Sequence, residues 1–231
     1  MSSSSKLYVR TLGLALILAA LAGCQGKPLS MQERGPTRSV YTGNQRTLYT
    51  FDDPATWDIF SVDNGLAYFR VVNKELEGHV AADRGYITST NNVQHDNVII
   101  NATLRQTDGL LGNGFGVVCR ADKAGNGYYF LLASSGEFTI SVGTPARNAL
   151  FELVPWQYHS RINQGVRENK IRAVCVDNYL AMFINDVFVA ETFDDEFTSG
   201  DLAVTVGAVD QPVTVRFDDI LVREARIVGT R

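Results

Sequence analysis

The chain has 231 residues, of which 45% are hydrophobic and 20% are charged, so it is too apolar to be disordered and long enough for one large domain or two small ones. Its formal charge of -4 and its scattered lysines and arginines lack the basic patch of a nucleic-acid binder, which excludes DNA and RNA as expected partners. Twenty glycines against three methionines favour a turn-rich β protein.

The N-terminal segment has the features of an export signal. Lys6 and Arg10 precede an apolar run over residues 12–20, which is too short to span a bilayer. The run ends in Leu-Ala-Gly-Cys24, which resembles the bacterial lipobox, where cleavage frees a cysteine that carries diacylglycerol. We expect removal of residues 1–23. The alternative is an ordinary signal peptide with an incidental cysteine.

A lipidated Cys24 would anchor the protein to the cell membrane or outer membrane, on the extracytoplasmic face. Residues 24–46 lack an apolar period and are rich in Gly, Pro, Ser, Gln and charged side chains. This composition predicts a flexible linker between the lipid and a folded domain. The expected partner of the N-terminal end is therefore the membrane itself.

Residues 47–225 consist of short alternating segments without a sustained 3.6-residue period, and they predict one β domain followed by a tail at 226–231. The clearest strand is 97–105, in which every second residue from Val98 to Leu104 is apolar. About a dozen such strands and no convincing helix favour an all-β sandwich of two antiparallel sheets.

Turn residues divide the second half of this domain into hairpins. A Ser-Ser-Gly turn separates the predicted strands 128–133 and 138–142. Asp-Asn and Asn-Asp pairs separate three further predicted strands, which are 171–176, 179–184 and 187–193. The last strand, 213–223, has apolar residues of both parities, so a bulge near Asp218 and Asp219 is expected to keep them all inward.

The three cysteines have two different expected roles. With Cys24 committed to lipid, Cys119 and Cys175 remain as a pair in an oxidising compartment, each inside a predicted strand. A disulfide between them would stabilise the fold by about 4 kcal/mol in the chain-entropy model. Two buried free thiols are the alternative.

Several motifs in the domain together resemble a known family. They are Phe51-Asp52-Asp53 with Trp57, Asn64-Gly65, Gly85-Tyr86-Ile87, Asn113 to Arg120 (NGFGVVCR), Tyr128 to Leu132 (YYFLL), Ile140-Ser141, Ile184-Asn185-Asp186, Phe197 to Gly200 (FTSG) and Phe217 to Ile220 (FDDI). This set is similar to the concanavalin A-like lectin/glucanase jelly roll, and most similar to its family 16 glycoside-hydrolase-like or 3-keto-disaccharide-hydrolase-like branch. The resemblance implies a jelly roll over residues 47–225, in a superfamily of enzymes, lectins and modules without a known ligand.

The catalytic pattern of the family is absent. Retaining glucanases of this fold carry Glu-x-Asp-x-x-Glu on one strand, which sets two carboxyls about 5 Å apart across the scissile bond. The acidic cluster at 191–196 has the wrong spacing, and the strand 128–133 has no acid where the keto-disaccharide branch carries acidic and amide side chains. We expect a non-catalytic module that binds a glycan or associates with the envelope. A glycoside hydrolase acting on an extracellular or envelope glycan is the alternative, and a protein–protein assembly module is a further one.

No cofactor is expected, because the three histidines share no metal-binding spacing. Asp52, Asp53, Asp218 and Asp219 lie at the two ends of the domain, which sandwiches often bring together, so they are candidates for a structural calcium site. Capping and turn roles are the alternative for these four residues.

Strand parity indicates which side chains line a groove. If Cys119 faces the core, then Gly114, Gly116 and Arg120 face outward, and a disulfide would set an outward Arg172 beside Arg120. A sugar needs an apolar platform and planar polar groups. The candidates for the platform are Trp156, Tyr158 and His159, in an expected loop after Pro155, with Tyr128 or Tyr129 from the strand that follows Arg120. The alternative is that these residues only cover a sheet face.

Overall fold

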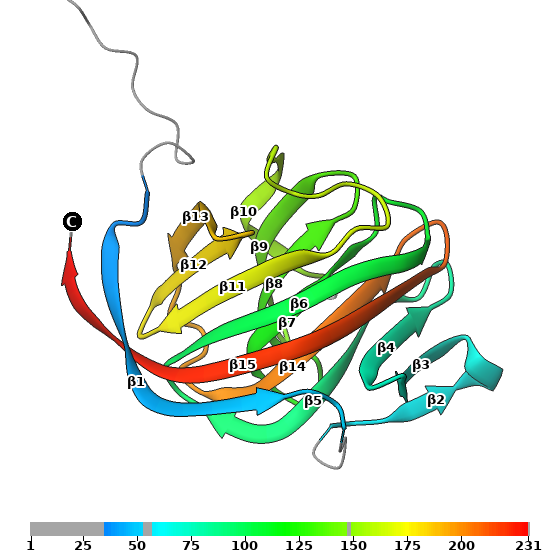
Figure 1. Ribbon diagram of the computed structural model, residues 1–231, viewed down its shortest axis with the longest axis horizontal. Helices are drawn as coiled ribbons and strands as arrows, with labels where there is room; N and C mark the ends of the chain where they lie inside the picture. Colours follow the sequence, from blue (N-terminus) through cyan, green and yellow to red (C-terminus); the bar gives the residue numbers. More distant parts are fainter. Residues whose placement is uncertain (1–34, 53–56, 147–148, 231) are drawn as a thin grey trace, which may run out of the picture.

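The computed structural model describes residues 35–52, 57–146 and 149–230, so the expected signal peptide at 1–23 and Cys24 lie outside the described residues. In the described part, the strands form two antiparallel sheets, one in front of the other in Figure 1. No helix found there has the length and apolar character needed to cross a bilayer. The predicted two-sheet sandwich is confirmed.

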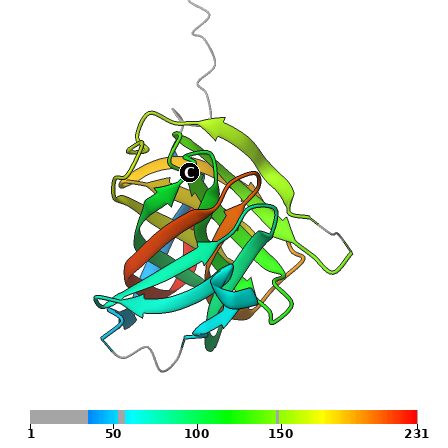
Figure 2. The same ribbon diagram turned by 90° about the vertical axis from the view of Figure 1, so that its right-hand side faces the viewer.

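One sheet has nine strands in the order β13-β12-β11-β6-β15-β4-β3-β2, with β1 also paired to β15, and the other has six in the order β10-β9-β8-β7-β14-β5. Figure 2 views the sandwich from the side of β2, β3 and β4. The nine-stranded sheet comprises β1 (Arg38–Tyr49), β2 (Phe60–Val62), β3 (Ala67–Val72), β4 (Glu75–Val80), β6 (Val98–Gly109), β11 (Asn169–Val176), β12 (Tyr179–Ile184), β13 (Val187–Phe193) and β15 (Val213–Thr230). The six-stranded sheet comprises β5 (Gly85–His95), β7 (Gly114–Ala121), β8 (Gly127–Ala133), β9 (Glu137–Gly143), β10 (Phe151–Tyr158) and β14 (Gly200–Ala208), and one 3-10 turn, η1 (Asp63–Gly65), follows β2.

The hairpins predicted from turn residues are present. The strands predicted at 171–176, 179–184 and 187–193 match β11, β12 and β13, and those at 128–133 and 138–142 lie within β8 and β9. Asn185 and Asp186, which join β12 to β13, have φ values of 49° and 64°. Asn and Asp tolerate positive φ better than most residues, so the turn chemistry sets the register of this meander.

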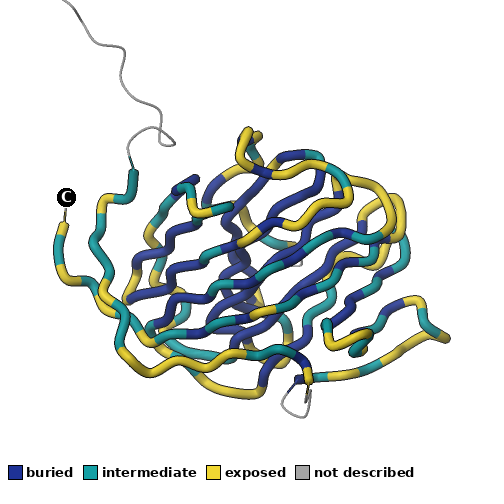
Figure 3. The backbone as a smooth tube through the Cα atoms, in the orientation of Figure 1, coloured by how far each residue is buried: buried dark blue, intermediate teal, exposed yellow. Residues whose placement is uncertain are grey.

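The bulge expected in the last strand is also present. The pairing of β15 with β6 shifts register between Asp218 and Leu221, and Asp219 has a φ of 49°. Apolar residues of both parities therefore reach the core between the sheets, and these residues are Val213, Val215, Phe217, Ile220 and Val222. Figure 3 shows the buried positions running along the inner strands of both sheets.

The limits predicted for the folded domain are too narrow. Residues 38–46, interpreted as linker, belong to β1, and residues 226–230, interpreted as tail, belong to β15. The two strands pair and run side by side at one edge in Figure 1. Val40 and Ile227 from this pair cover a small apolar cluster on the outer face of the nine-stranded sheet, where Val174 and Phe188 lie. Few side chains of β1 pack against apolar groups, so most of its residues are polar. Its sequence therefore lacks the alternation of apolar and polar residues that predicts a strand.

Candidate functional site

The outer face of the six-stranded sheet carries a second cluster of apolar side chains. Val118, Tyr129, Leu131 and Ala203 are buried there, and Leu150 packs against them. These residues have the opposite parity to Val117 and Phe130, which face the core between the sheets. An apolar cluster therefore lies on the outer side of this sheet as well, buried beneath other side chains.

Two half-exposed aromatic side chains lie across this face. Tyr86 from β5 lies over Gly207 of β14, where a Cβ atom would overlap the Tyr86 ring. A Cβ atom on Gly114 of β7 would lie 2.5 Å from the Tyr86 hydroxyl and 3.2 Å from the Trp156 indole, so the two side chains meet over Gly114. Both Tyr86 and Trp156 are 36% exposed. We call this pair the aromatic platform.

A pocket of about 620 Å³ adjoins Tyr86. The Tyr129 ring packs edge-on to the Tyr86 ring, with 6.2 Å between the ring centroids. The pocket lies between β5, the loop that joins β7 to β8, and the loop that joins β9 to β10. Its described polar side chains are Thr88, Lys123, Asn126 and Thr144, besides the two tyrosines. None of its described lining residues is Asp or Glu.

Two tyrosines and a lysine are the ionisable groups among the described residues that line the pocket. Burial raises the pKa of Tyr86 and of Tyr129 to about 12, so both phenols are neutral near pH 7. The Lys123 ammonium lies 3.5 Å from the Asp58 carboxylate, 3.8 Å from that of Asp201 and 3.1 Å from the Thr90 hydroxyl. Burial alone would raise the pKa of Asp58, but hydrogen bonds from Asn92 and Thr90 and the charge of Lys123 hold it below its usual value. Lys123 is therefore neutralised by two carboxylates.

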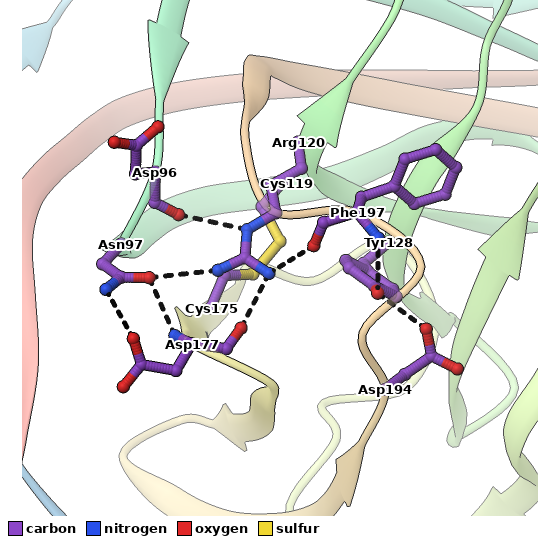
Figure 4. The surroundings of a disulfide bond; sticks show 9 residues. All are labelled: Asp96, Asn97, Cys119, Arg120, Tyr128, Cys175, Asp177, Asp194 and Phe197. Atoms are coloured by element: carbon purple, nitrogen blue, oxygen red, sulfur yellow. Dashed lines mark hydrogen bonds between the residues drawn. A yellow bond between two sulfur atoms is a disulfide. The ribbon is translucent and has the colours of Figure 1, made fainter.

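The predicted disulfide between Cys119 and Cys175 is present, with 6.7 Å between the two Cα atoms. It joins β7 of one sheet to β11 of the other, across the core (Figure 4). The expectation that it would set Arg172 beside Arg120 is wrong, because the bond connects facing sheets and not neighbouring strands. Arg172 lies on the outer face of the nine-stranded sheet, where it donates a hydrogen bond to Asn101 and pairs with Asp186.

Arg120 was predicted to face outward, and it is buried with 2% exposure. Its guanidinium donates to the backbone carbonyls of Asp96, Asp177 and Phe197 at 3.1, 2.8 and 2.6 Å, and to the Asn97 side chain (Figure 4). The parity argument fails because Arg120 has a φ of 55°, beside a register shift in the pairing of β7 with β14. Arg120 therefore joins three loops at one end of the sandwich.

Two more predicted ligand residues have structural roles. Tyr128 is fully buried, and its hydroxyl donates to Asp194 at 2.6 Å and accepts from the Phe197 amide at 3.0 Å. His159 is 8% exposed, packs edge-on to Phe138, and accepts a hydrogen bond from the Arg161 amide through Nδ1. Both side chains are therefore occupied by protein contacts.

The expected loop after Pro155 is a strand. Trp156 and Tyr158 belong to β10, and the 57% exposed Tyr158 ring lies beside Gly136 at the end of that strand. Gly114 does lie beneath the platform, as a groove floor would. Gly116 does not offer an open floor, because a Cβ atom there would overlap the Phe130 carbonyl oxygen.

Three of the four candidate calcium ligands lie in the described residues. Asp52 pairs with Lys74 at 2.6 Å and accepts from Thr50, while Asp218 and Asp219 lie at the bulge of β15. Asp53 lies outside the described residues. Across the described ranges, no three His, Cys, Asp or Glu side chains are grouped closely enough to hold a metal ion. The calcium site stays a prediction.

Sequence reasoning missed Tyr86 and Gly207. Tyr86 was part of the motif Gly85-Tyr86-Ile87, and it shares strand parity with Thr88, which also lines the pocket. Gly207 of β14 pairs with Tyr86 of β5, although more than a hundred residues separate the two strands in the chain. The sequence alone does not show this pairing. The glycine that leaves room for the ring becomes visible only when the sheet order is known.

Comparisons with known proteins define the class of fold. No family model and no curated protein matches the chain. Among solved structures, the carbohydrate-binding module CBM66 from Bacillus subtilis is 14% identical, with a TM-score of 0.58 over 71% of this chain and 93% of that one. A laminarinase from a Flavobacterium species is 12% identical, with a TM-score of 0.54 over 78% and 99%. The Crh5 transglycosylase is 8% identical, with a TM-score of 0.55 over 84% and 90%. The domain thus shares the two-sheet jelly-roll fold of these structures, which is the fold that the motifs predicted.

Proposed function

We propose that the protein is a membrane-anchored, extracytoplasmic lipoprotein whose jelly-roll domain binds a glycan at the aromatic platform and the adjoining pocket. The observation that carries this proposal is the pair Tyr86 and Trp156, which lies half-exposed over Gly114 and Gly207. Aromatic faces stack on the C–H face of a sugar ring, and neutral hydroxyl and amide groups bond its hydroxyls. The pocket supplies such groups at Thr88, Asn126 and Thr144.

The charged groups in and near the pocket support glycan binding without hydrolysis. Retaining glycoside hydrolysis uses two carboxyl groups about 5 Å apart, one of them protonated. The described lining residues of the pocket include no carboxylate, and the nearby Asp58 has a lowered pKa, which keeps it ionised. A hydrolase and a protein-binding module remain as outcomes of the experiment below.

The glycan proposal is tested with the Cys24→Ser chain on a glycan array, followed by titration of the best oligosaccharide. We expect Trp156→Ala to weaken binding about tenfold, because it removes half of the stacking surface. The control is Phe151→Ala on the same strand, whose side chain is 49% exposed and does not belong to the platform. Equal loss in both variants, or cleavage of the oligosaccharide, would contradict the proposal, and so would a stable protein partner with no affinity for any glycan.

The membrane part of the proposal depends on Cys24. We expect the unaltered protein to sediment with membranes and the Cys24→Ser protein to leave that fraction, because two or more acyl chains are needed for stable anchoring. Fractionation of cells that express each form, followed by immunoblotting, measures this difference. Membrane association that survives Cys24→Ser would rule out the lipid anchor.

A further inference from the structure

A groove of about 360 Å³ lies on the outer face of the nine-stranded sheet, on the opposite side of the sandwich from the aromatic platform. Side chains from β11, β6, β15 and β1 line it, together with Asp186 of the turn between β12 and β13. We call it the outer groove. Its lining side chains follow two rows across the strands, and each row has a distinct chemical order.

The first row runs from a cation through an amide to an apolar wall. Arg172 pairs across the strands with Asn101, Asn101 with Leu221, and Leu221 with Leu48. The Arg172 guanidinium is held in place by a 3.1 Å hydrogen bond to Asn101, a 2.7 Å ion pair with Asp186 and the Phe183 ring beneath it. Little conformational entropy is left for Arg172 to lose when a ligand binds.

The second row runs from a cation through a hydroxyl to carboxylates. Lys170 pairs across the strands with Thr103, and Thr103 with Asp218, beside the bulge that exposes Asp219. Within the described ranges, neither the Lys170 ammonium nor the Asp219 carboxylate forms an ion pair. The second row therefore has a free positive group at one end and a free negative group at the other.

The negative end is reinforced by its neighbours. Asp218 accepts a hydrogen bond from the Asp219 amide at 2.8 Å. Burial raises the pKa of Asp218, and the charges of Asp219 and Glu75 add to this effect, while the hydrogen bond from the Asp219 amide and the charge of Arg105 oppose it. The exposed Asp219 carboxylate lies at this end of the groove, where it would attract a bound cation.

The span of the groove sets the size of the ligand. Strands β11 and β15 lie on either side of β6, which separates the two ends by about 10 Å at 4.7–4.9 Å per strand spacing. An extended dipeptide is about 7 Å long, so its two charged ends come within reach of side chains at both ends of the groove. Its peptide group would lie over Asn101 and Thr103, and an apolar side chain at its amino end would meet Leu221 and Leu48.

We propose that the outer groove is a second ligand site that takes a short peptide with a free ammonium group and a free carboxylate. The ligand carboxylate lies toward Lys170 and Arg172, and the ammonium group toward Asp219. Asp186 already neutralises much of the Arg172 charge, so Lys170 carries the larger part of the carboxylate recognition. This site does not depend on the proposed glycan site, because the two lie on opposite faces of the sandwich.

The test is calorimetric titration of the Cys24→Ser chain with leucyl-alanine, N-acetyl-leucyl-alanine and leucyl-alanine amide. We expect the free dipeptide to bind in the millimolar range and each blocked derivative to bind about fivefold more weakly, as the loss of one exposed ion pair predicts. Asp219→Asn should weaken only the free dipeptide and the amide. It keeps the side chain's size and its tolerance of positive φ, so the fold is not at risk.

Lys170→Gln provides the converse variant, since it should weaken only the ligands that have a free carboxylate. Tyr86→Ala on the opposite face is the control, and it should leave dipeptide affinity unchanged. The proposal is overturned if the blocked derivatives bind as well as the free dipeptide, if the unaltered groove binds none of the three at millimolar concentration, or if Tyr86→Ala removes the binding.

Discussion

Replacing Arg120 with methionine is expected to lower the free energy of unfolding by about 3–5 kcal/mol. The guanidinium is 2% exposed and satisfies three backbone carbonyls and one amide oxygen, which belong to three separate loops. Methionine fills a similar volume but donates no hydrogen bond, so the three carbonyls lose this donor, while the Asn97 side-chain oxygen keeps its hydrogen bond from the Asp177 amide. Chemical denaturation at pH 7, monitored by tryptophan fluorescence, measures the effect.

Arg172→Met is the matched control for this experiment. Both residues are strand arginines with hydrogen bonds, but the Arg172 side chain is 37% exposed and its partner Asp186 is 77% exposed. Surface ion pairs of this kind contribute about 0–1 kcal/mol, so the control should lose no more than that. Similar losses in the two variants would mean that Arg120 does not join the loops in the way described.

The Cys119→Ala, Cys175→Ala double variant is expected to lose about 4 kcal/mol of stability, which is the chain-entropy estimate for a loop of this length. The bond closes a loop with a sequence separation of 56 residues and joins the two sheets across the core. For a domain of this size, such a loss lowers the Tm by about 8–16 °C. Scanning calorimetry of the unaltered and double-variant chains, both carrying Cys24→Ser, measures the difference.

A double variant that melts within about 2 °C of the parent chain would show that the disulfide adds little to the packing of the sheets. Peptide mapping without reducing agent accompanies the calorimetry, because a free thiol at Cys175 in exported protein would mean that the bond does not form there. The two measurements separate a bond that is absent from one that is present and energetically unimportant.

The sequence predicts the inner strands of the fold well and its margins poorly. Between 171 and 193, turn pairs such as Asn185-Asp186 define the boundaries between the three strands, because few residues other than Gly, Asn and Asp adopt positive φ there. At β1, only Val40 and Tyr49 pack against buried apolar clusters, so the strand has no alternating pattern and is held by pairing with the end of β15. Pairing between distant segments leaves no periodic signal in either one.

For the candidate site, the sequence predicts residue types better than their orientation. Trp156 and Gly114 were predicted as platform and floor, and the structure brings them together. Arg120 was assigned to the same groove on strict alternation, which a single residue with a φ of 55° is enough to break. Tyr86 reaches the platform only because β14 places Gly207 beneath its ring, and no local pattern contains that information.

The proposed role of Tyr86 and Trp156 as the glycan-binding surface is tested by Gly207→Ala, which removes no group that would touch the ligand. The three atoms nearest to the added methyl all belong to the Tyr86 ring, so the methyl should displace the platform and leave the backbone in place. Gly112→Ala is the control, since a Cβ atom there meets nothing within 4 Å. Titration of the array-selected oligosaccharide should show about tenfold weaker binding for Gly207→Ala and unchanged binding for Gly112→Ala, with both variants as stable as the parent chain. Unchanged affinity in a Gly207→Ala protein would contradict this proposed role.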